Sequence, residues 1–588
     1  MRSLALRDRR LLVIAPSLTA AMVVLVLSMA TVAGASHGIL DWALVVPFVA
    51  VMAWECLAVW QQVLGFWASM VGPRLLSPIE RDATTIDPTP TGRSRTAIVM
   101  PIFEEDADEV FARIRVLWAS LARLGVPDDV VVHVLSDTKS RHVAAAEERH
   151  AALLRAGDMP TLQYRRRECN AGRKAGNVGE FLERAGRDYD FAVVLDADSL
   201  MTGAAVRRLI RLMERHDRVG LIQTVSYATG RETLFARMQQ FAVRLYAPLA
   251  LRGLEFWQGG EGSYWGHNAI LRIAPFLQHC KLPILSGPPP FGGEILCHDI
   301  VEAALLVRAG WEVRLLPETE GTWEEMPTNA SDLLGREKRW CQGNLQHARL
   351  LGLPGLRSGS KAHILLGIAG YLTAPLWWGF LLLGAARVLF GGPAQGLGVL
   401  AFGLTEPGWA PMVLAVLAMV LIVTPRLLNL WRALWDRQLR RSFGGARRLL
   451  AGAAIEQVFW LLFGPALSMT TASFVLRTLA GRVVSWDAQP RWERHVGLVQ
   501  AAVLHWPHLV VALILAVACT KVGGWYAAWM AAPASGLLLS PLMTSVSSRV
   551  DLGRWSRRQG LFMTVDDVDP ARELLDLRAL SPGQTTRA

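Results

Sequence analysis

Apolar residues in this chain are concentrated in two blocks, one on each side of a long stretch with the composition of an ordinary water-soluble domain. Several segments are apolar over about 20 residues or more, the length that a helix needs to cross the hydrocarbon core of a bilayer. These candidate spans are residues 11–34, 40–70, 363–390, 409–430, 498–519 and 523–545. Because a spanning segment must satisfy its backbone polar groups internally, the pattern restricts the fold to a soluble domain inserted between groups of membrane helices.

Residues 449–478 form a further apolar stretch whose path the sequence leaves open. Arginine-rich segments stand on both sides of it, so both sides are expected in the cytoplasm. Gly464 and Pro465 favour a turn or kink in its middle. A tight hairpin here gives about eight spans in total, and a re-entrant or interfacial element gives about six. The sequence leaves both open. Two polar residues in this stretch, Glu456 and Gln457, are expected to face a cavity.

The net charge of +11 is explained by arginines that flank the spans. This distribution is typical of membrane proteins with cytoplasmic basic loops and does not point to nucleic acid as a partner. The first apolar block is too long for a signal peptide and a second follows at once, which indicates membrane anchors and places both chain ends in the cytoplasm. The six cysteines include no CxxC pair, so neither a zinc site nor a disulfide framework is expected.

Composition divides the chain into four parts. They are two spans in residues 1–70, a soluble domain in 71–361, the remaining spans in 362–545 with a cytoplasmic connection at 479–496, and a polar cytoplasmic tail in 546–588. Within the soluble domain, strand-like apolar runs alternate with helical segments, which is typical of an α/β domain with a mostly parallel sheet. Ligands of such sheets bind at the carboxyl ends of the strands.

The pair Asp196 and Asp198 directly follows the apolar run 191–195. Two carboxylates at positions i and i+2 can hold a hard divalent cation, which neutralises a departing diphosphate. An isolated pair of this kind is more often a solvated turn. Its place at a strand end of a domain between membrane spans favours a site for Mg²⁺ or Mn²⁺.

Two further segments suit a nucleotide. Asp137 ends the apolar run 130–135 and could accept from a uracil imide or a ribose, or could cap a turn. Lys174 lies between Gly172 and Gly176, and a fixed cation in a flexible loop suits a diphosphate. The alternative for Lys174 is a solvated basic loop.

Asp299 stands before a helix-like segment and is a candidate general base, which an inverting transfer needs in order to take the proton of an attacking hydroxyl. Its alternative role is that of a helix N-cap. The string Arg336 to Trp340 follows. Arg339 could bind a pyrophosphate and Trp340 could stack on a sugar ring, with Gln342 nearby, unless the segment is only an amphipathic surface helix.

In order, these elements read D…RKAGN…DxD…HD…RxxRW, with spans before and after. The chain resembles the processive family 2 glycosyltransferases, which include cellulose and hyaluronan synthases. That resemblance implies a Rossmann-like GT-A fold, a nucleotide site at Glu105, Asp137, Lys174, Asp196 and Arg339, and a cation on Asp198 and Asp196. It also implies Asp299 as the base, and an acceptor site with Trp340, His298 and Gln342.

Four longer strings are similar to one branch, the glucosyltransferase H family. They are Tyr264–Ile270, Phe291–Glu294, His298–Ala304 and Arg339–His347. This resemblance implies a UDP-glucose donor, a β-1,2-linked glucan product, the bacterial inner membrane and its lipids as surroundings, and contacts with acyl carrier protein and a periplasmic glucan-processing protein. The chain departs from the wider pattern at Arg336, where most synthases have Gln, and at Glu104, where Asn is usual. It also lacks the long N-terminal extension of larger members.

The connection 479–496 occupies the place of the gating loop of cellulose synthases, with Trp486, Gln489 and Arg491 as candidate contacts to the nucleotide. A plain connector is the alternative. Other readings of the whole chain are a synthase of another β-glucan, a single-sugar transferase to a lipid carrier, a sugar transporter without catalysis, and a membrane anchor. Neither of the last two needs Asp196, Asp198 and Asp299 together.

Overall fold

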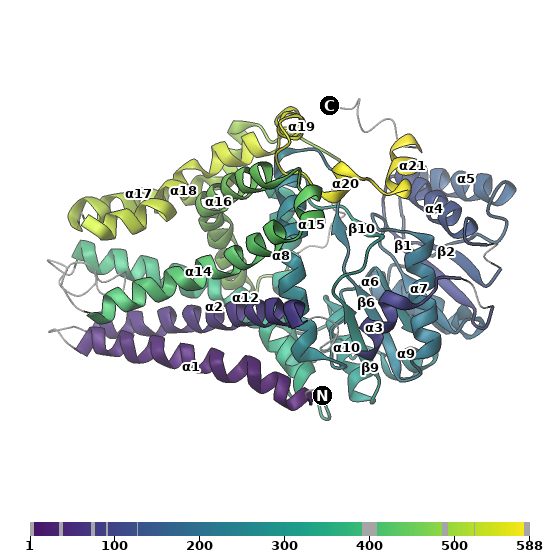
Figure 1. Cartoon of the computed structure of the whole chain (residues 1–588), viewed down its shortest axis with the longest axis horizontal. Coiled ribbons are helices and arrows are strands. Elements are labelled where there is room, and N and C mark those ends of the chain that lie inside the picture. Colours follow the sequence, from purple (N-terminus) through teal and green to yellow (C-terminus); the bar gives the residue numbers. More distant parts are fainter. Residues whose placement is uncertain are drawn as a thin grey trace.

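The computed structural model describes residues 5–33, 39–71, 77–89, 92–125, 128–390, 409–484, 492–522 and 524–580. Long helices extend to one side and an α/β domain forms the other side (Figure 1). The residues Trp486, Gln489 and Arg491, which were expected in a gating loop, lie outside the described residues.

The α/β domain is built on a seven-stranded sheet with the order β3-β2-β1-β4-β8-β6-β9. The strands are β1 (Thr96–Ile102), β2 (Val130–Ser136), β3 (Gln163–Arg166), β4 (Phe191–Val194), β6 (Val219–Thr224), β8 (Ala269–Arg272) and β9 (Glu312–Leu316). All neighbours are parallel except β8, which is antiparallel to β4 and β6. The expected mostly parallel sheet is thus confirmed, with one reversed strand in its middle.

Helices cover both faces of this sheet, which explains why its central strands are apolar throughout. In β1, Ile98 packs in a core with α4 (Ala107–Ala122) and α7 (Gly203–Arg215), whereas Val99 packs on the opposite face with α6 (Arg173–Ala185) and α10 (His298–Arg308). The remaining helices of the domain are α3 (Pro78–Thr85), α5 (Arg141–Ala156), α8 (Leu234–Gln258), α9 (Ile273–His279) and α11 (Ala330–Gln346).

A small second sheet has the order β5-β10-β7. Its strands are β5 (Leu200–Met201), β7 (Tyr227–Ala228) and β10 (Thr322–Glu324). The strand β5 comes directly after Asp198, and β10 pairs with it antiparallel, Thr322 opposite Met201 and Trp323 opposite Leu200. The small sheet therefore brings a distant part of the chain to the paired aspartates.

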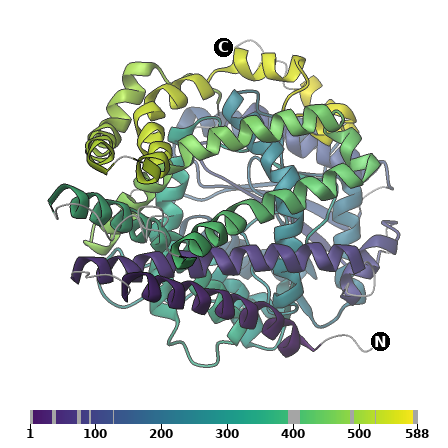
Figure 2. The same ribbon diagram turned by 60° about the vertical axis from the view of Figure 1, so that its left-hand side comes forward.

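The long helices are α1 (Leu6–Ala33), α2 (Ile39–Val71), α12 (Ser358–Phe390), α14 (Trp409–Trp435), α16 (Ala446–Leu479), α17 (Leu498–Val522) and α18 (Gly524–Ser547). Within the described residues, six helices are long and apolar enough to cross a membrane, and they come before and after the α/β domain in sequence. Viewed from the helical side, α1 and α2 lie at one edge, α17 and α18 at the other, and α14 and α16 between them (Figure 2).

Of the two alternatives for residues 449–478, the hairpin is wrong. The helix α16 runs without a break through Gly464 and Pro465 over 34 residues and packs on α11, α12 and α18. A proline inside a helix removes one backbone donor, which neighbouring helices can compensate in an apolar bundle. Glu456 on α16 is buried and accepts a hydrogen bond of 3.2 Å from Tyr246 of α8. That Glu456 and Gln457 face a cavity stays a prediction.

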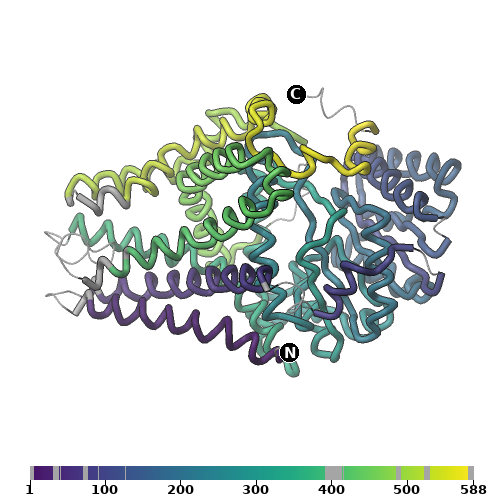
Figure 3. The backbone as a smooth tube through the Cα atoms, viewed as in Figure 1, coloured from purple at the N-terminus to yellow at the C-terminus, as the bar shows by residue number. Residues whose placement is uncertain are grey.

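The polar C-terminal segment is folded against the α/β domain. It forms α19 (Val550–Arg558), α20 (Val565–Val568) and α21 (Arg572–Leu580), and its path from the membrane helices to α4 can be followed in Figure 3. The buried Glu573 of α21 accepts hydrogen bonds from Ser120 and Arg123 of the α4 region. Residues 550–580 thus belong to the structure of the soluble part.

The α/β domain and the membrane bundle meet in a close contact between α2 and α8. A Cβ atom added to Gly65 would lie 2.0 Å from the Leu249 carbonyl oxygen, and one added to Gly253 would lie 1.9 Å from the Gln61 carbonyl oxygen. Side chains at either glycine would force the helices apart, so backbone touches backbone here.

Candidate active site

Acidic residues gather where β1, β2 and β4 end side by side. The register pairs Ile102 at the end of β1 with Ser136 at the end of β2, and β4 ends two residues before Asp196. Glu104 has a positive φ of 56°, and its carboxylate accepts from the backbone amides of Lys139 and Ser140 at 2.8 and 2.9 Å. Glu104 therefore joins the ends of β1 and β2, and the half-buried Glu105 follows it at this edge.

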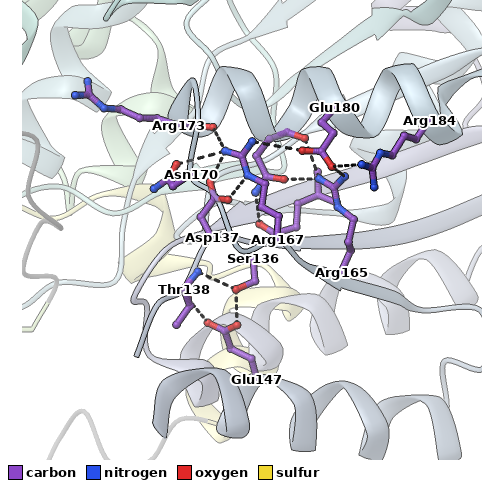
Figure 4. Close-up of polar contacts among 12 residues, drawn as sticks. Ser136, Asp137, Thr138, Glu147, Arg165, Arg167, Asn170, Arg173, Glu180 and Arg184 are labelled. Carbon is purple, nitrogen blue, oxygen red and sulfur yellow. Dashed lines mark hydrogen bonds and ion pairs between the residues drawn. The ribbon is translucent and has the colours of Figure 1, made fainter. Parts of the chain in front are cut away.

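Asp137 is buried and held by a guanidinium group that the sequence did not single out (Figure 4). Both terminal carboxylate oxygens accept from Arg167, with Nη2 2.9 Å from Oδ2. The same Nη2 donates to the Arg173 carbonyl oxygen at 2.7 Å and to Asn170 at 3.3 Å. Arg167 thus fixes the direction of the Asp137 carboxylate and ties it to the start of α6.

The next layer below this contact is a buried carboxylate, Glu147 of α5. It accepts from the hydroxyls of Ser136 and Thr138 at 2.6 Å each and from Tyr164 at 2.8 Å. All three donors lie at or beside the ends of β2 and β3. This network makes the floor of the site rigid, because a satisfied buried polar network specifies a single arrangement.

Lys174, in the first turn of α6, reaches Asp196. Its ammonium group forms an ion pair with Asp196 Oδ1 and donates to the Gly266 carbonyl oxygen at 2.7 Å. Burial opposes a charge on Asp196, but Lys174 and then His267 outweigh it, so the pKa of the Asp196 carboxyl is lowered. Lys174 is consequently no solvated loop residue, and Asp196 is ionised at neutral pH.

Gly266 lies between the aspartate pair and Asp299. It has a φ of +88°, and a Cβ atom placed on it would lie 3.4 Å from Asp299 Oδ2 and 3.6 Å from Lys174 Nζ. Asp299, Lys174 and Asp196 therefore surround one short stretch of backbone. The expected base and the expected cation site, more than 100 residues apart in the chain, lie next to each other.

Asp299 does not cap its helix. The N-cap of α10 is Cys297, and Asp299 lies in the first turn, so the alternative of an N-cap role is wrong. Its neighbour His298 is held by Glu302, whose Oε2 lies 3.0 Å from Nδ1. Burial lowers the pKa of His298, but the Glu302 carboxylate outweighs burial and the pKa is raised.

The helix α11 carries Arg336, Arg339 and Trp340. The Trp340 side chain is exposed and the Arg336 guanidinium stacks over its ring at 4.6 Å from the centroid. Arg339 is half-buried and acts electrostatically on Cys297 at the start of α10. The end of α11 also holds the segment before Asp299, because Gln346 accepts from Leu296 N at 3.0 Å.

Gln342, expected to meet the acceptor, has a structural contact that the sequence could not show. Its side chain is buried and its oxygen accepts from Val484 N at 2.8 Å. On the far side of the undescribed residues 485–491, Arg494 binds Asp332 at 2.6 Å near the start of α11. Both ends of the connection between α16 and α17 are therefore attached to the helix that carries Trp340. An acceptor role for Gln342 remains a prediction.

Two models of known families match this region. Glycosyl transferase family 2 matches residues 97–279, and glycosyl transferase family group 2 matches residues 191–390. A glucans biosynthesis glucosyltransferase H of Xanthomonas campestris pv. campestris is 36% identical over 588 residues, which cover 96% of this chain and 88% of the relative. One of Caulobacter vibrioides is 39% identical over 530 residues, which cover 84% and 78%. The chain belongs to the glucosyltransferase H family. Its α/β domain is a family 2 glycosyltransferase domain of the GT-A type, and the enzyme is a membrane protein that transfers hexose in glucan synthesis.

A solved mannosyltransferase of Pyrobaculum calidifontis, in complex with GDP-mannose and Mn²⁺, is also similar, with a TM-score of 0.41 and 15% identity. The likeness covers 66% of this chain and 99% of that one. It is too distant to say which ligand this member of the glucosyltransferase H family binds.

The residues of this glucosyltransferase H family member fit a divalent cation that arrives with a diphosphate. Within the described ranges, no three His, Cys, Asp or Glu side chains are close enough to hold a metal ion by themselves. Mg²⁺ and similar cations commonly take one or two carboxylates and complete their coordination with substrate phosphates and water. Asp196 and Asp198 supply that number of carboxylates at a strand end.

His267 and Glu324 are further polar groups at the aspartates for which the sequence analysis had no role. His267 Nε2 lies 3.4 Å from Glu324 Oε2, and the two side chains are 17% and 25% exposed. Burial raises the pKa of the Glu324 carboxyl, His267 opposes this, and the nearby Asp198 raises it further. Glu324 is separated from Asp198 by more than 100 residues, so only the pairing of β10 with β5 reveals it.

Proposed function

We propose that this protein is an inverting, processive glucosyltransferase that polymerises glucose from UDP-glucose into a β-1,2-linked glucan. It acts from the cytoplasmic face of the bacterial inner membrane, with both chain ends in the cytoplasm, and passes the growing glucan into the helical bundle. The observation that carries the proposal is the meeting of Lys174, Asp196 and Asp299 around Gly266. The carboxylates for a metal ion, the Lys174 ammonium group for a diphosphate and the candidate base Asp299 converge there.

On the donor side, Asp137 and Glu105 hold the nucleoside, with Arg167 fixing the Asp137 carboxylate. Asp196 and Asp198 hold Mg²⁺ or Mn²⁺, which supplies charge neutralisation for the diphosphate when bound. Lys174 and Arg339 add positive charge beside the same phosphates, and such preorganised charges stabilise the leaving group more than the bound substrate.

On the acceptor side, the exposed face of Trp340 stacks on the terminal sugar, because Arg336 occupies the other face of its ring. His298 hydrogen-bonds to the acceptor and is held in place by Glu302. Asp299 takes the proton of the attacking hydroxyl. The hydroxyl oxygen forms a bond to the anomeric carbon from the face opposite UDP, and the bond to UDP breaks with its electron pair. An α-linked donor therefore gives a β-linked product.

The proposal also covers the surroundings of the reaction. The connection 479–496 is a gating segment over the nucleotide, and acyl carrier protein and a periplasmic glucan-processing protein are partners in assembly. The attachment of Val484 to Gln342 supports a link between that segment and the acceptor helix.

The test uses the full chain in lipid nanodiscs with radiolabelled UDP-glucose and Mg²⁺. We expect a polymer that a β-1,2-specific glucanase degrades and that Asp299→Asn abolishes. The matched control Asp158→Asn changes an exposed carboxylate that is not among the proposed site residues and leaves synthesis unchanged. A polymer resistant to that glucanase would assign another linkage. Addition of one glucose to lipid would exclude processivity. No turnover with UDP-glucose would exclude UDP-glucose as the donor.

A further inference from the structure

Residues 280–297 lead from α9 to α10 and form neither a helix nor a strand of a sheet. Asp299 lies in the first turn of α10, so its place depends on how this connection is held. The first part of the connection closes on itself, because Leu285 and Gly293 exchange two backbone hydrogen bonds of 3.0 and 2.9 Å. The last part, the segment 292–297, is held by one turn of α11.

Gln346, the last residue of α11, binds this segment with its side-chain amide. Its Oε1 accepts from Leu296 N at 3.0 Å, and its Nε2 donates to the carbonyl oxygens of Glu294 at 3.0 Å and Gly292 at 3.4 Å. An amide presents a donor and an acceptor side by side, as a backbone peptide group does. Gln346, which is 1% exposed, therefore takes the place of a neighbouring strand for the segment 292–297.

Two more residues beside Gln346 contact Cys297, which stands two positions before Asp299. A Cβ atom added to Gly343 would lie 2.3 Å from Cys297 Sγ and 3.1 Å from its backbone nitrogen, so the backbone of α11 lies directly against this residue. The fully buried His347 has its Nε2 2.8 Å from the Cys297 carbonyl oxygen. A carbonyl oxygen only accepts, so Nε2 carries a hydrogen and donates it. One helical turn thus fixes the approach to Asp299.

The same helix carries the ring that is expected to stack on the acceptor. Trp340 lies about one turn before Gly343 in an unbroken helix, and the helical backbone fixes the distance between them. The helix α11 is itself bound to α12, because the Tyr371 hydroxyl donates to Glu337 at 3.0 Å. Trp340 and the backbone that leads into Asp299 therefore belong to one rigid unit.

We propose that Gln346 is a positioning residue of the transfer reaction, whose amide fixes the segment 292–297 to α11 so that Asp299 faces a sugar on Trp340. This inference rests on the proposed function, because it takes Asp299 as the base and Trp340 as the acceptor contact. Gln346 acts through Asp299 and is not itself a catalytic residue. The donor groups lie on α6 and after β4, and so do not depend on this amide.

Loss of the amide should lower kcat and leave the KM for the donor unchanged, because a displacement of about 1 Å at a reacting group can cost about 100-fold in rate. Gln346→Met keeps the length of the side chain and removes its donor and acceptor. Gln346→Glu keeps the acceptor for Leu296 N but turns a second oxygen toward the Glu294 carbonyl oxygen, and these two acceptors repel each other.

The two variants differ in their dependence on pH. Protonation of the carboxyl group introduced by Gln346→Glu restores a donor beside an acceptor. Burial and the neighbouring carbonyl oxygens disfavour its charged form, so its pKa is raised above the ordinary glutamate value. Activity of Gln346→Glu relative to the wild type should therefore rise as pH falls. Gln346→Met has no group to titrate, and its relative activity should be the same at every pH.

The experiment uses the full chain in nanodiscs and measures kcat and KM for UDP-glucose from UDP release, between about pH 6 and 9. Each value is divided by that of the wild type at the same pH, which removes the titration of groups that all variants share. We expect Gln346→Met to lower kcat by about 10–100-fold with KM within about twofold. Gln346→Glu should regain at least about fivefold in relative kcat from the upper to the lower pH. UDP affinity with Mn²⁺, measured by calorimetry, should stay within about twofold in both.

A matched control makes the same change elsewhere. Gln163→Glu alters an exposed glutamine of β3 and should leave kcat and KM unchanged at every pH. The inference is overturned if Gln346→Met keeps the kcat of the wild type, or if the relative kcat of Gln346→Glu does not change with pH. It is also overturned if UDP affinity falls as much as kcat, which would indicate damage to the donor site or to the fold.

The proposed function is tested separately by the product of the wild type and by the loss of turnover in Asp299→Asn. Relative kcat is defined for any donor that the wild type uses, and for single-sugar transfer as well as for a polymer. Another donor or linkage would therefore change the proposed function and leave the role of Gln346 in place, whereas full turnover in Asp299→Asn would remove the base on which both depend.

Discussion

Lys174 and Asp196 form an ion pair across the floor of the site, and the lysine is anchored from behind by the Gly266 carbonyl oxygen at 2.7 Å. The ammonium group is therefore bound to one of the two carboxylates that are expected to hold the divalent cation. A compact lysine charge and a divalent cation compete for the same oxygen.

The first prediction concerns this competition. Lys174→Gln should tighten the binding of Mn²⁺ in the absence of nucleotide several-fold, and should weaken UDP in the presence of Mn²⁺. The measurement is Mn²⁺ titration followed by electron paramagnetic resonance, with and without UDP. If Mn²⁺ alone binds no better to the variant, the ion pair does not restrain the cation site.

The second prediction concerns pH. The Glu302 carboxylate outweighs burial and raises the pKa of His298. This pair stabilises the fold fully below the ordinary histidine pKa of about 6.5 and loses that contribution as pH rises through the raised value. Turnover should fall over the same range. Glu302→Gln should move this alkaline limb down by roughly one pH unit or more. An unmoved limb would show that His298 carries no charge in the working enzyme, and Glu183→Gln on the surface of α6 serves as control.

The third prediction concerns Glu255 on α8. Burial, followed by repulsion from Glu80, raises the pKa of its carboxyl to about 8, and its Oε1 has no hydrogen-bond partner among the residues that the structure describes. An acid with a raised pKa binds its proton more tightly in the folded state, so its contribution to stability falls as pH rises from the ordinary value near 4.5 to about 8. Glu255→Gln should therefore increase the free energy of unfolding at pH 8.5 by about 2–4 kcal/mol, and the melting temperature with it. At pH 5 both should change little. Equal shifts at both pH values would contradict a charged Glu255.

The fourth prediction concerns the C-terminal segment. Glu573 accepts from Ser120, whose hydroxyl accepts in turn from Gly203 N at 2.8 Å at the start of α7. Glu573→Ala should cost about 1–3 kcal/mol, because buried donors lose their acceptor, and should open the segment after α19 to proteases. Glu573→Gln should cost less. Thermal melting and limited proteolysis report the two effects, and a protected segment in the alanine variant would mean that α21 docks by apolar contacts alone.

Much of the α/β domain could be predicted because its strands are buried on both faces. Residues such as Val99 and Met100 are apolar in succession, and acidic residues follow each run, which placed the site at the strand ends. The reversed strand β8 could not be predicted, since its direction depends on pairing with β4 and β6 and leaves no mark in a four-residue run. The continuous helix α16 was missed for a similar reason. A proline such as Pro465 interrupts a helix in water, and the helix continues through it here because neighbouring helices pack around it.

Individual site residues were easier to foresee than their partners. Asp137 and Asp196 stand out by position in the chain, whereas Arg167 and Glu324 become visible only when β3 and β10 are paired with their neighbours. Arg167 stands in the run of three arginines 165–167, and nothing in this run distinguishes a buried arginine from a solvated one. Pairing across 30 or more residues is a property of the folded sheet, and one sequence does not contain it.

The contact of Gly65 with α8 and of Gly253 with α2 bears on how a polymer could move through such an enzyme. Because backbone touches backbone there, a slide or tilt of the α/β domain against α2 would have to break this contact. If the enzyme is processive and this contact persists, each advance by one sugar length is a movement of the glucan past the α/β domain, and not of the domain against α2.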